Sequence, residues 1–186
     1  MTSPTLSFSE LALAPSLTQA VAEMGYETMT PIQAQAIPVV LTGQDVMGAA
    51  QTGTGKTAAF SLPLLQRLSQ SDEAVASNSI RALVLVPTRE LAEQVMTSFR
   101  QYGEHLAVSS YAAYGGVSIN PQMMRLRRGV DVLVATPGRL IDLFTKNAVK
   151  LRQVQTLVLD EADRMLDLGF ADDLDILFQA LPKKRQ

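Results

Sequence analysis

Residues 50–57 carry the strongest chemical signal in this sequence. They read Ala-Gln-Thr-Gly-Thr-Gly-Lys-Thr, follow a short apolar run at 46–50 and precede a helical pattern at 58–62. A strand, a glycine-rich turn and a helix N-terminus in this order form an anion cradle, because backbone N–H groups and the helix dipole face the ligand. Lys56 is placed to reach the β- and γ-phosphates, and Thr57 to ligate Mg²⁺. The phosphate site is therefore expected to comprise Gln51, Thr52, Gly53, Thr54, Gly55, Lys56 and Thr57.

A pair of acids offers the second half of such a site. The apolar residues 157–159 are followed directly by Asp160 and Glu161. A carboxylate at the end of a buried strand can hold Mg²⁺, usually through water, and the next one can orient or deprotonate an attacking water. Exposed acids after a strand are common, but the order of the two motifs along the chain favours phosphate chemistry.

Short apolar runs alternate with helical patterns through the rest of the chain. Repeated strand-then-helix order predicts a mostly parallel, doubly wound sheet flanked by helices, with right-handed crossovers. We expect Pro38 to kink or end its helix and Pro63 to disturb the next one. The expected strands are 46–50, 82–86, 108–114, 130–135 and 154–159, and the expected helices are 16–24, a helix from 31, 58–62 onward, 91–99, 120–127, 137–144 and 174–181.

The carboxyl ends of these strands are expected to lie along one edge of the sheet, where open α/β folds bind ligands. Two further segments of this edge each combine a Thr that can cap a helix with an Arg in its first turn. They suit a polynucleotide backbone, although each is also an ordinary helix cap. A glycine pair between them allows close backbone approach or makes a simple turn. The residues concerned are Pro87, Thr88, Arg89, Gly115, Gly116, Thr136, Pro137, Gly138 and Arg139.

Gln33 has two candidate roles. With Thr30 it fits a capping box, which is purely structural. A Gln side chain can also pair with the N6 donor and N7 acceptor of adenine, and Tyr26 could stack on the base. From the residues alone the cap is favoured.

Composition narrows the function classes. The 186 residues include 47% apolar residues, no cysteine and a single histidine, His105, so disulfides and cysteine nucleophiles are excluded and a transition-metal centre is not expected. The net charge of −2 gives no basic footprint, so nucleic-acid binding must rest on local sites. The N-terminus lacks a signal-peptide pattern and no apolar run reaches membrane-spanning length, so we expect a cytoplasmic protein.

In this order the motifs closely resemble the N-terminal half of DEAD-box ATP-dependent RNA helicases, from about Phe8 to the end of the chain. The resemblance rests on Asp160-Glu-Ala-Asp163, on Gly25-Tyr-Glu-Thr-Met-Thr-Pro-Ile-Gln33, and on the phosphate loop, whose first residue, Ala50, is usual in that family. The segment 115–124 further resembles the bacterial RhlE-type branch. The resemblance implies one RecA-like P-loop domain over residues 1–186, with residues 8–40 as its adenine-reading flank.

The family's residue roles carry over position by position. They imply that ATP and Mg²⁺ are the cofactors, that Gln33 reads adenine with Phe8 and Tyr26 beside it, and that Lys56 binds phosphate. Thr57 and Asp160 would hold Mg²⁺, Glu161 would be the catalytic base, and Asp163 would couple the nucleotide site to a second domain. The residues at 87–89, 115–116 and 136–139 would grip RNA phosphates and sugars, independently of base sequence.

The resemblance also implies a second RecA-like domain with arginine fingers, which these residues do not include. Such fingers speed phosphoryl transfer roughly a thousandfold or more. We therefore expect the chain alone to bind nucleotide with little turnover and to leave duplexes intact. The rival readings are a nucleotide-gated RNA clamp, a P-loop DNA translocase and, more distantly, a small-molecule kinase.

Overall fold

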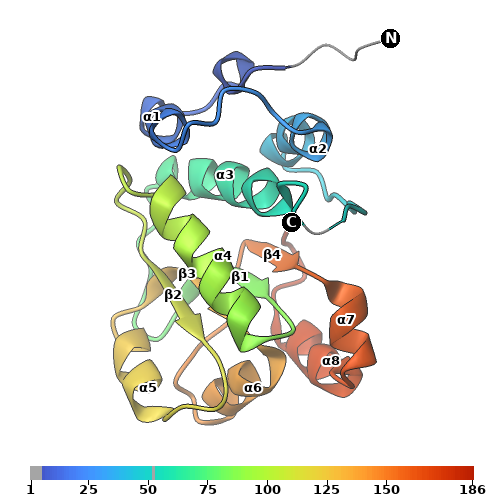
Figure 1. Cartoon of the computed structure of the whole chain (residues 1–186). Helices are drawn as coiled ribbons and strands as arrows, with labels where there is room; N and C mark the ends of the chain where they lie inside the picture. Colours follow the sequence, from blue (N-terminus) through green and yellow to red (C-terminus); the bar gives the residue numbers. More distant parts are fainter. Residues whose placement is uncertain (1–5, 52) are drawn as a thin grey trace. The chain divides into compact units, whose positions relative to one another are not determined.

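The computed structural model describes residues 6–51 and 53–186 (Figure 1). The chain forms two compact units. The first contains the described residues up to 72 together with 98–108, and the second contains residues 73–97 and 109–186. The expectation of a single domain over residues 1–186 stays a prediction.

The first unit is helical. It contains a 3-10 turn η1 (Phe8–Glu10) and the helices α1 (Pro15–Glu23), α2 (Pro31–Leu41) and α3 (Lys56–Ser69). Helix α2 begins as expected, with Thr30 as its N-cap and Pro31 at the first helical position. It packs against α3, and both helices bury apolar side chains, among them Ile37 and Leu62. This packing places the beginning of α3, and with it the phosphate loop, beside the beginning of α2.

The two prolines inside these helices do not end them. Pro38 lies within α2 and Pro63 within α3, and both helices continue past the proline. Of the two effects expected of Pro38, the end of the helix is therefore wrong, and a kink stays a prediction. A proline inside a helix removes one backbone hydrogen bond, but burial of an apolar helix face contributes more than the propensity of a single residue.

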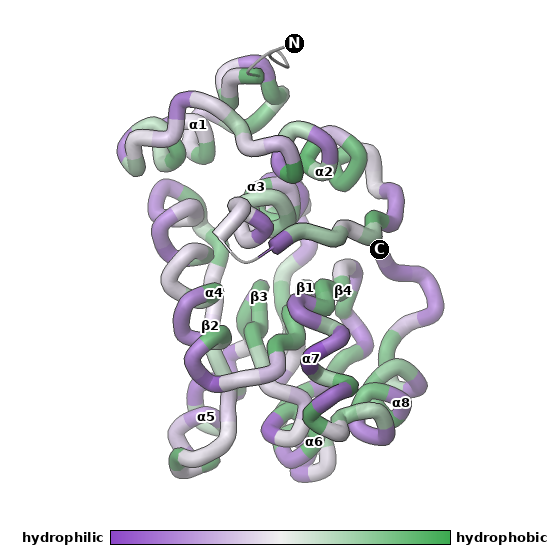
Figure 2. The backbone as a smooth tube through the Cα atoms, turned by 45° about the vertical axis from the view of Figure 1, so that its right-hand side comes forward, coloured by the Kyte–Doolittle hydropathy of each residue, from purple (hydrophilic) through white to green (hydrophobic). Residues whose placement is uncertain are grey.

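The second unit is built on a four-stranded sheet in the order β2-β3-β1-β4, and every pair of neighbours is parallel. The strands are β1 (Ile80–Leu85), β2 (Ser110–Ala113), β3 (Val130–Ala135) and β4 (Thr156–Leu159). The two central strands, β1 and β3, are fully buried, which explains why their sequences are apolar apart from Arg81 and Asp131. Most of both strands is coloured as hydrophobic in Figure 2. The expected parallel α/β sheet is confirmed.

Helices follow the strands. They are α4 (Arg89–Tyr102), which ends in the first unit, and α5 (Asn120–Leu126), α6 (Pro137–Thr145), α7 (Ala162–Asp167) and α8 (Ala171–Ala180). Helices α6 and α8 lie against each other. One core cluster joins Leu83 and Leu133 of the sheet to Leu126, Leu140 and Leu177 of the helices. The alternation of strand and helix patterns in the sequence therefore predicted the α/β class correctly.

The strand expected at residues 46–50 is absent. Residues 44–50 have no regular secondary structure, and Val46 and Met47 are exposed. On the outer edge of β4, Gln186 takes the hydrogen-bonding position, because the Leu157 N–H donates to its carbonyl and its own N–H donates to Gln155. A short apolar run needs a partner strand to become a strand itself, and residues 46–50 have none within the described part of the chain.

A buried ion pair fixes the register between β1 and β3. Nη2 of Arg81 lies 2.6 Å from Oδ1 of Asp131, and both side chains are at most one-tenth exposed. The second oxygen, Oδ2, accepts from the backbone N–H of Ser109 at 2.7 Å and from its hydroxyl at 2.8 Å. The carboxylate therefore ties the entry to β2 to the two central strands.

Candidate functional site

The phosphate loop leads directly into α3. Gly53 and Gly55 have φ values of +82° and +86°, so both adopt the left-handed conformation that favours glycine. Gly55 is the N-cap, and Lys56 and Thr57 are the first two helical residues. The free N–H groups of this first turn and the helix dipole make the segment an anion site. The helix therefore begins at Lys56, two residues earlier than expected, and Thr52 of the expected phosphate site lies outside the described residues.

Gln33 links the phosphate loop to the beginning of α2. Its Oε1 accepts from the Thr30 backbone N–H at 2.9 Å, and its Nε2 donates to the Gly55 carbonyl at 3.1 Å. The expected capping box of Thr30 and Gln33 is thus formed at the beginning of α2. An amide carries two donor hydrogens and two acceptor lone pairs. Gln33 therefore keeps one N–H and one lone pair for another partner.

The two aromatic residues of the expected adenine site differ in exposure. Phe8 is buried in η1, whose backbone N–H donates to the Glu27 carbonyl, so η1 is tied to the segment that leads into α2. Tyr26 is 46% exposed, and a ring can stack on it. Burial, followed by the charge and hydrogen bond of Tyr26, raises the pKa of Tyr102 to about 12. At physiological pH Tyr102 is therefore a neutral phenol, and its side chain forms a hydrogen bond with the Tyr26 side chain.

The acids after β4 lie at the carboxyl edge of the sheet. Asp160 is buried and its backbone N–H donates to the Leu85 carbonyl, which continues the ladder with β1. Glu161 follows in the left-handed conformation, with φ +53° and ψ +50°, and is the N-cap of α7. Its carboxylate is one-fifth exposed and lies 3.5 Å from Nη1 of Arg164. Asp163 is exposed in the first turn of α7.

The backbone of Glu161 is strained, which leads to a stability prediction. A left-handed residue that is not glycine costs about 1–2 kcal/mol, and Asn tolerates this conformation best among the others. We expect Glu161→Asn to raise the free energy of unfolding by about 0.5–1 kcal/mol over Glu161→Gln, which removes the same charge but keeps the strain. Urea unfolding of both variants measures the difference. Equal stability of the two variants would show that the strain contributes nothing.

Arg89 is held at the surface by its neighbours. It stacks on the Tyr114 ring at 4.8 Å, and its Nε donates to Oε1 of Glu93 at 3.2 Å. The Tyr114 hydroxyl donates to the same oxygen at 2.8 Å. The Arg89 side chain remains half exposed, and the Thr88 hydroxyl caps α4 by accepting from the Leu91 N–H. The geometry presents a fixed guanidinium to an outside anion.

The glycine pair follows β2 at the same edge of the sheet. Gly116 has φ +79°, which explains the need for glycine there, but at Gly115 an added Cβ would meet no atom within 4 Å. Nothing inside the chain therefore requires glycine at 115. Beyond β3, Thr136 is the N-cap of α6, with Pro137 first in the helix. Thr136 and Pro137 are buried, and Gly138 is partly exposed.

Arg139 differs from Arg89 because its side chain is buried. Its guanidinium is nine-tenths buried and donates to Gln122 Oε1 at 3.0 Å and to the Val117 carbonyl at 2.8 Å. Gln122 was not predicted from the sequence, and neither were Glu93 and Tyr114 as partners of Arg89. The four-residue spacing of Arg89 and Glu93 was a usable signal. A single buried Gln in a short helix gives no such signal.

The candidate residues are divided between the two units. Gln33, the phosphate loop, Lys56 and Thr57 belong to the first unit, and the acids at 160, 161 and 163 belong to the second, as do all nine residues of the expected RNA site. Each set is brought together within its own unit.

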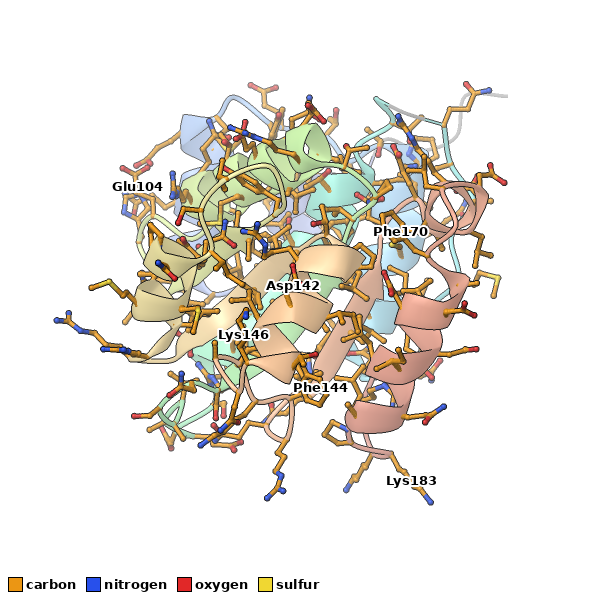
Figure 3. All side chains as sticks on the ribbon, turned by 90° about the horizontal axis from the view of Figure 1, so that it is seen from below. Glu104, Asp142, Phe144, Lys146, Phe170 and Lys183 are labelled. Atoms are coloured by element: carbon orange, nitrogen blue, oxygen red, sulfur yellow. The ribbon has the colours of Figure 1, made fainter. Side chains whose placement is uncertain are left out.

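His105 makes a pair with Glu23 within the first unit. Its Nε2 lies 2.8 Å from Oε2 of Glu23, and Glu104, labelled in Figure 3, lies close enough to complete a three-residue group. All three side chains are exposed and the group carries no further sign of a metal. Chiefly through their mutual hydrogen bond, the pKa of His105 is raised and the pKa of Glu23 is lowered.

This pair predicts a pH dependence of stability. The His105 contribution is complete below its ordinary pKa of 6.5 and is lost as the pH rises through the raised value. The Glu23 contribution is present above its ordinary pKa of 4.5 and is lost as the pH falls through the lowered value. We expect the difference in unfolding free energy between wild type and His105→Gln to be largest between pH 4.5 and pH 6.5, the ordinary pKa values of Glu and His. The difference should vanish in alkaline solution, where His105 is neutral. Chemical unfolding across this pH range measures it, and an equal difference at all pH values would contradict it.

Among the described residues, no helix has both the length and the apolar character that crossing a membrane requires.

Comparisons with known proteins identify similar chains. The family model for DEAD/DEAH box helicases matches residues 30–186. The DEAD-box ATP-dependent RNA helicase CshA of Streptococcus pneumoniae is 44% identical over 181 residues, covering 97% of this chain and 34% of that protein. CshA of Bacillus cereus is 44% identical over 180 residues, with 97% and 33% covered, and CshA of Limosilactobacillus reuteri is 45% identical over 181 residues, with 97% and 35% covered.

The chain therefore spans about a third of the length of the curated relatives it matches. These relatives carry the name CshA, and the expected RhlE-type branch is not confirmed. The family model covers most of the chain and includes the phosphate loop, the acids at 160–163 and the expected RNA-contacting edge. The chain belongs to the DEAD/DEAH box helicase family.

Proposed function

We propose that this chain is the ATP-binding, RNA-contacting half of an ATP-dependent RNA helicase that hydrolyses ATP to separate short RNA duplexes. The observation that carries the proposal is Gln33, which joins the phosphate loop to the beginning of α2 and keeps hydrogen-bonding capacity for a base. The names of the relatives, all ATP-dependent RNA helicases, support the same reading.

Adenine nucleotide fits the residues of the first unit. The left-handed Gly55 leaves room for the Gln33 amide, since a Cβ there would lie 2.3 Å from Nε2 of Gln33. The remaining N–H and lone pair of Gln33 match N7 and the N6 amino group of adenine, and they do not match guanine in this orientation. Tyr26 and Phe8 complete the base site, while residues 51–57 and the Lys56 ammonium bind the phosphates.

Mg²⁺ fits the donor set as well, because the Thr57 hydroxyl and the Asp160 carboxylate are hard oxygen ligands. When bound, the ion neutralises the charge that develops on the phosphates. Glu161 accepts a hydrogen bond from the attacking water, orients it and takes its proton. Asp163 couples this site to the second RecA-like domain.

RNA fits the carboxyl edge of the sheet. Arg89 offers a fixed charge, and the first turns of α4 and α6 offer backbone N–H groups to phosphates. The open surface at Gly115 allows a sugar–phosphate backbone to approach closely. Since these groups read no bases, binding is independent of sequence. The contacting residues are Pro87, Thr88, Arg89, Gly115, Gly116, Thr136, Pro137 and Gly138, with Arg139 behind them.

The experiment uses a full-length protein that contains this chain, together with its Glu161→Gln variant. We expect ATP hydrolysis that RNA stimulates and DNA does not, strand displacement of a short RNA duplex, and a loss of both activities of at least about 100-fold in the variant. Stimulation by DNA would indicate a translocase. RNA-stimulated hydrolysis without strand displacement would indicate a clamp. Low turnover by the 186 residues alone and a cytoplasmic location stay predictions.

A further inference from the structure

Arg139 lies at the centre of a buried polar network. The guanidinium is bound by two protein oxygens, from Gln122 and Val117, and its Nε lies 3.8 Å from the Asp142 carboxylate. Asp142 is one turn further along α6 and is labelled in Figure 3. Both ends of the guanidinium fork are therefore engaged within the protein. The Arg139 side chain is buried, whereas the Arg89 side chain is half exposed.

Gln122 completes the network from the other side. It is 4% exposed, and while its Oε1 accepts from Arg139, its Nε2 donates to the Tyr114 carbonyl at 3.1 Å. Tyr114 directly precedes the glycine pair, and Val117 directly follows it. The two side chains thus hold the carbonyls on both sides of Gly115-Gly116.

A glycine pair needs such support more than other residues do. Glycine loses more conformational freedom on ordering than any other residue, and a loop that must be ordered on binding weakens the affinity by that amount. Gly115 and Gly116 are exposed, and an added Cβ at either position would meet no atom within 4 Å, so packing around them does not fix them. The hydrogen bonds at Tyr114 and Val117 do.

We propose that Gln122 and Arg139 form a positioning latch, which fixes the Gly115-Gly116 turn in the shape that receives the RNA backbone. Arg139 acts on RNA through this turn and makes no phosphate contact of its own. The inference rests on the proposed RNA function and deepens it by separating Arg89, which contacts phosphate, from Arg139, which positions the turn.

Three variants of the 186-residue chain separate these roles. Gln122→Met keeps the volume and removes both hydrogen bonds of the amide, Arg139→Met removes the guanidinium, and Arg89→Gln removes a charge that contacts phosphate. Backbone ¹⁵N order parameters of Gly115, Gly116 and Val117 measure how far the latch holds the turn. The affinity for a single-stranded oligouridylate, followed as a function of salt, measures the RNA contact.

We expect both latch variants to lower the order parameters of the turn from about 0.85 to below about 0.6, while the amides of β1 and β3 stay protected from hydrogen exchange, which shows that the fold is intact. Both should weaken oligouridylate binding about tenfold with an unchanged salt slope. Arg89→Gln should leave the order parameters of the turn unchanged and reduce the salt slope by about 0.7, because one phosphate contact is lost.

Two results would overturn the latch: unchanged order parameters in the turn of Gln122→Met, or a salt slope that falls in Arg139→Met as it does in Arg89→Gln. If the wild-type chain binds no oligouridylate, the proposed RNA function fails and the role of the latch in RNA binding falls with it. The order parameters then still decide whether the latch itself exists.

Discussion

Asp131→Ala is expected to lower the free energy of unfolding by about 3–5 kcal/mol, because removal of one partner leaves a buried charge uncompensated. Asp131 accepts two hydrogen bonds from Arg81 and two from Ser109, so the substitution leaves a guanidinium and a backbone N–H without this acceptor. Urea unfolding measures the change, and an unaltered m-value would show that the cooperative transition is retained.

The matched control is the double variant Arg81→Met/Asp131→Leu. Replacement of both partners by apolar side chains removes the buried charges together, and such replacements are often neutral or stabilising. We therefore expect the double variant to be clearly more stable than Asp131→Ala. A loss below about 1 kcal/mol in the single variant would mean that water reaches the guanidinium and that the pair does not hold the register of β1 and β3.

Gly55→Ala is expected to lower the affinity for ADP about 100-fold. Its φ of +86° strains any residue with a Cβ by about 1–2 kcal/mol. The new Cβ would also lie 2.3 Å from Nε2 of Gln33, so the amide must move and release its hydrogen bonds to Thr30 and to the Gly55 carbonyl. Each of these contributes about 1 kcal/mol.

Gly53→Ala provides the control for backbone strain. Its φ of +82° is nearly the same, but an added Cβ would meet no atom within 4 Å. We expect about a tenfold loss of ADP affinity in this variant, with selectivity for adenine retained. Isothermal calorimetry compares the two alanines. If both lost affinity equally, Gln33 would have no part in shaping the nucleotide site.

Where a pattern is local and strongly periodic, the sequence predicts the fold well. The expected strand at 130–135 coincides with β3, and the expected helix at 137–144 differs from α6 by one residue. Each of these two elements is unbroken and buries apolar side chains at the spacing that its sequence predicts. Local periodicity and burial therefore favour the same structure.

Where structure depends on partners distant in the sequence, prediction was incomplete. The apolar run at 46–50 has a strand-like composition, but it lacks a partner strand, and composition cannot reveal that. The short helix α7 was missed because it begins at a left-handed Glu161, a conformation that no local rule assigns to Glu.

In the candidate site, too, local motifs were predictable and contacts between distant residues were not. The segments at 87–89, 136–139 and 160–161 follow parallel strands that are neighbours in the sheet, as expected, whereas the strand expected before the phosphate loop is absent. The motifs could not distinguish an exposed Arg89 from a buried Arg139, because that difference arises from Gln122 and Tyr114, which lie on other elements. Gln33 serves as helix cap in this structure and stays a predicted adenine reader.

The most direct test of the central claim is calorimetric titration of the wild-type chain with ADP and then with GDP, in the presence of Mg²⁺. A site built from Gln33, Lys56 and Thr57 predicts saturable binding of ADP and no detectable binding of GDP. Equal binding of both nucleotides would contradict the adenine-reading role of Gln33, and binding of neither would contradict the nucleotide site itself.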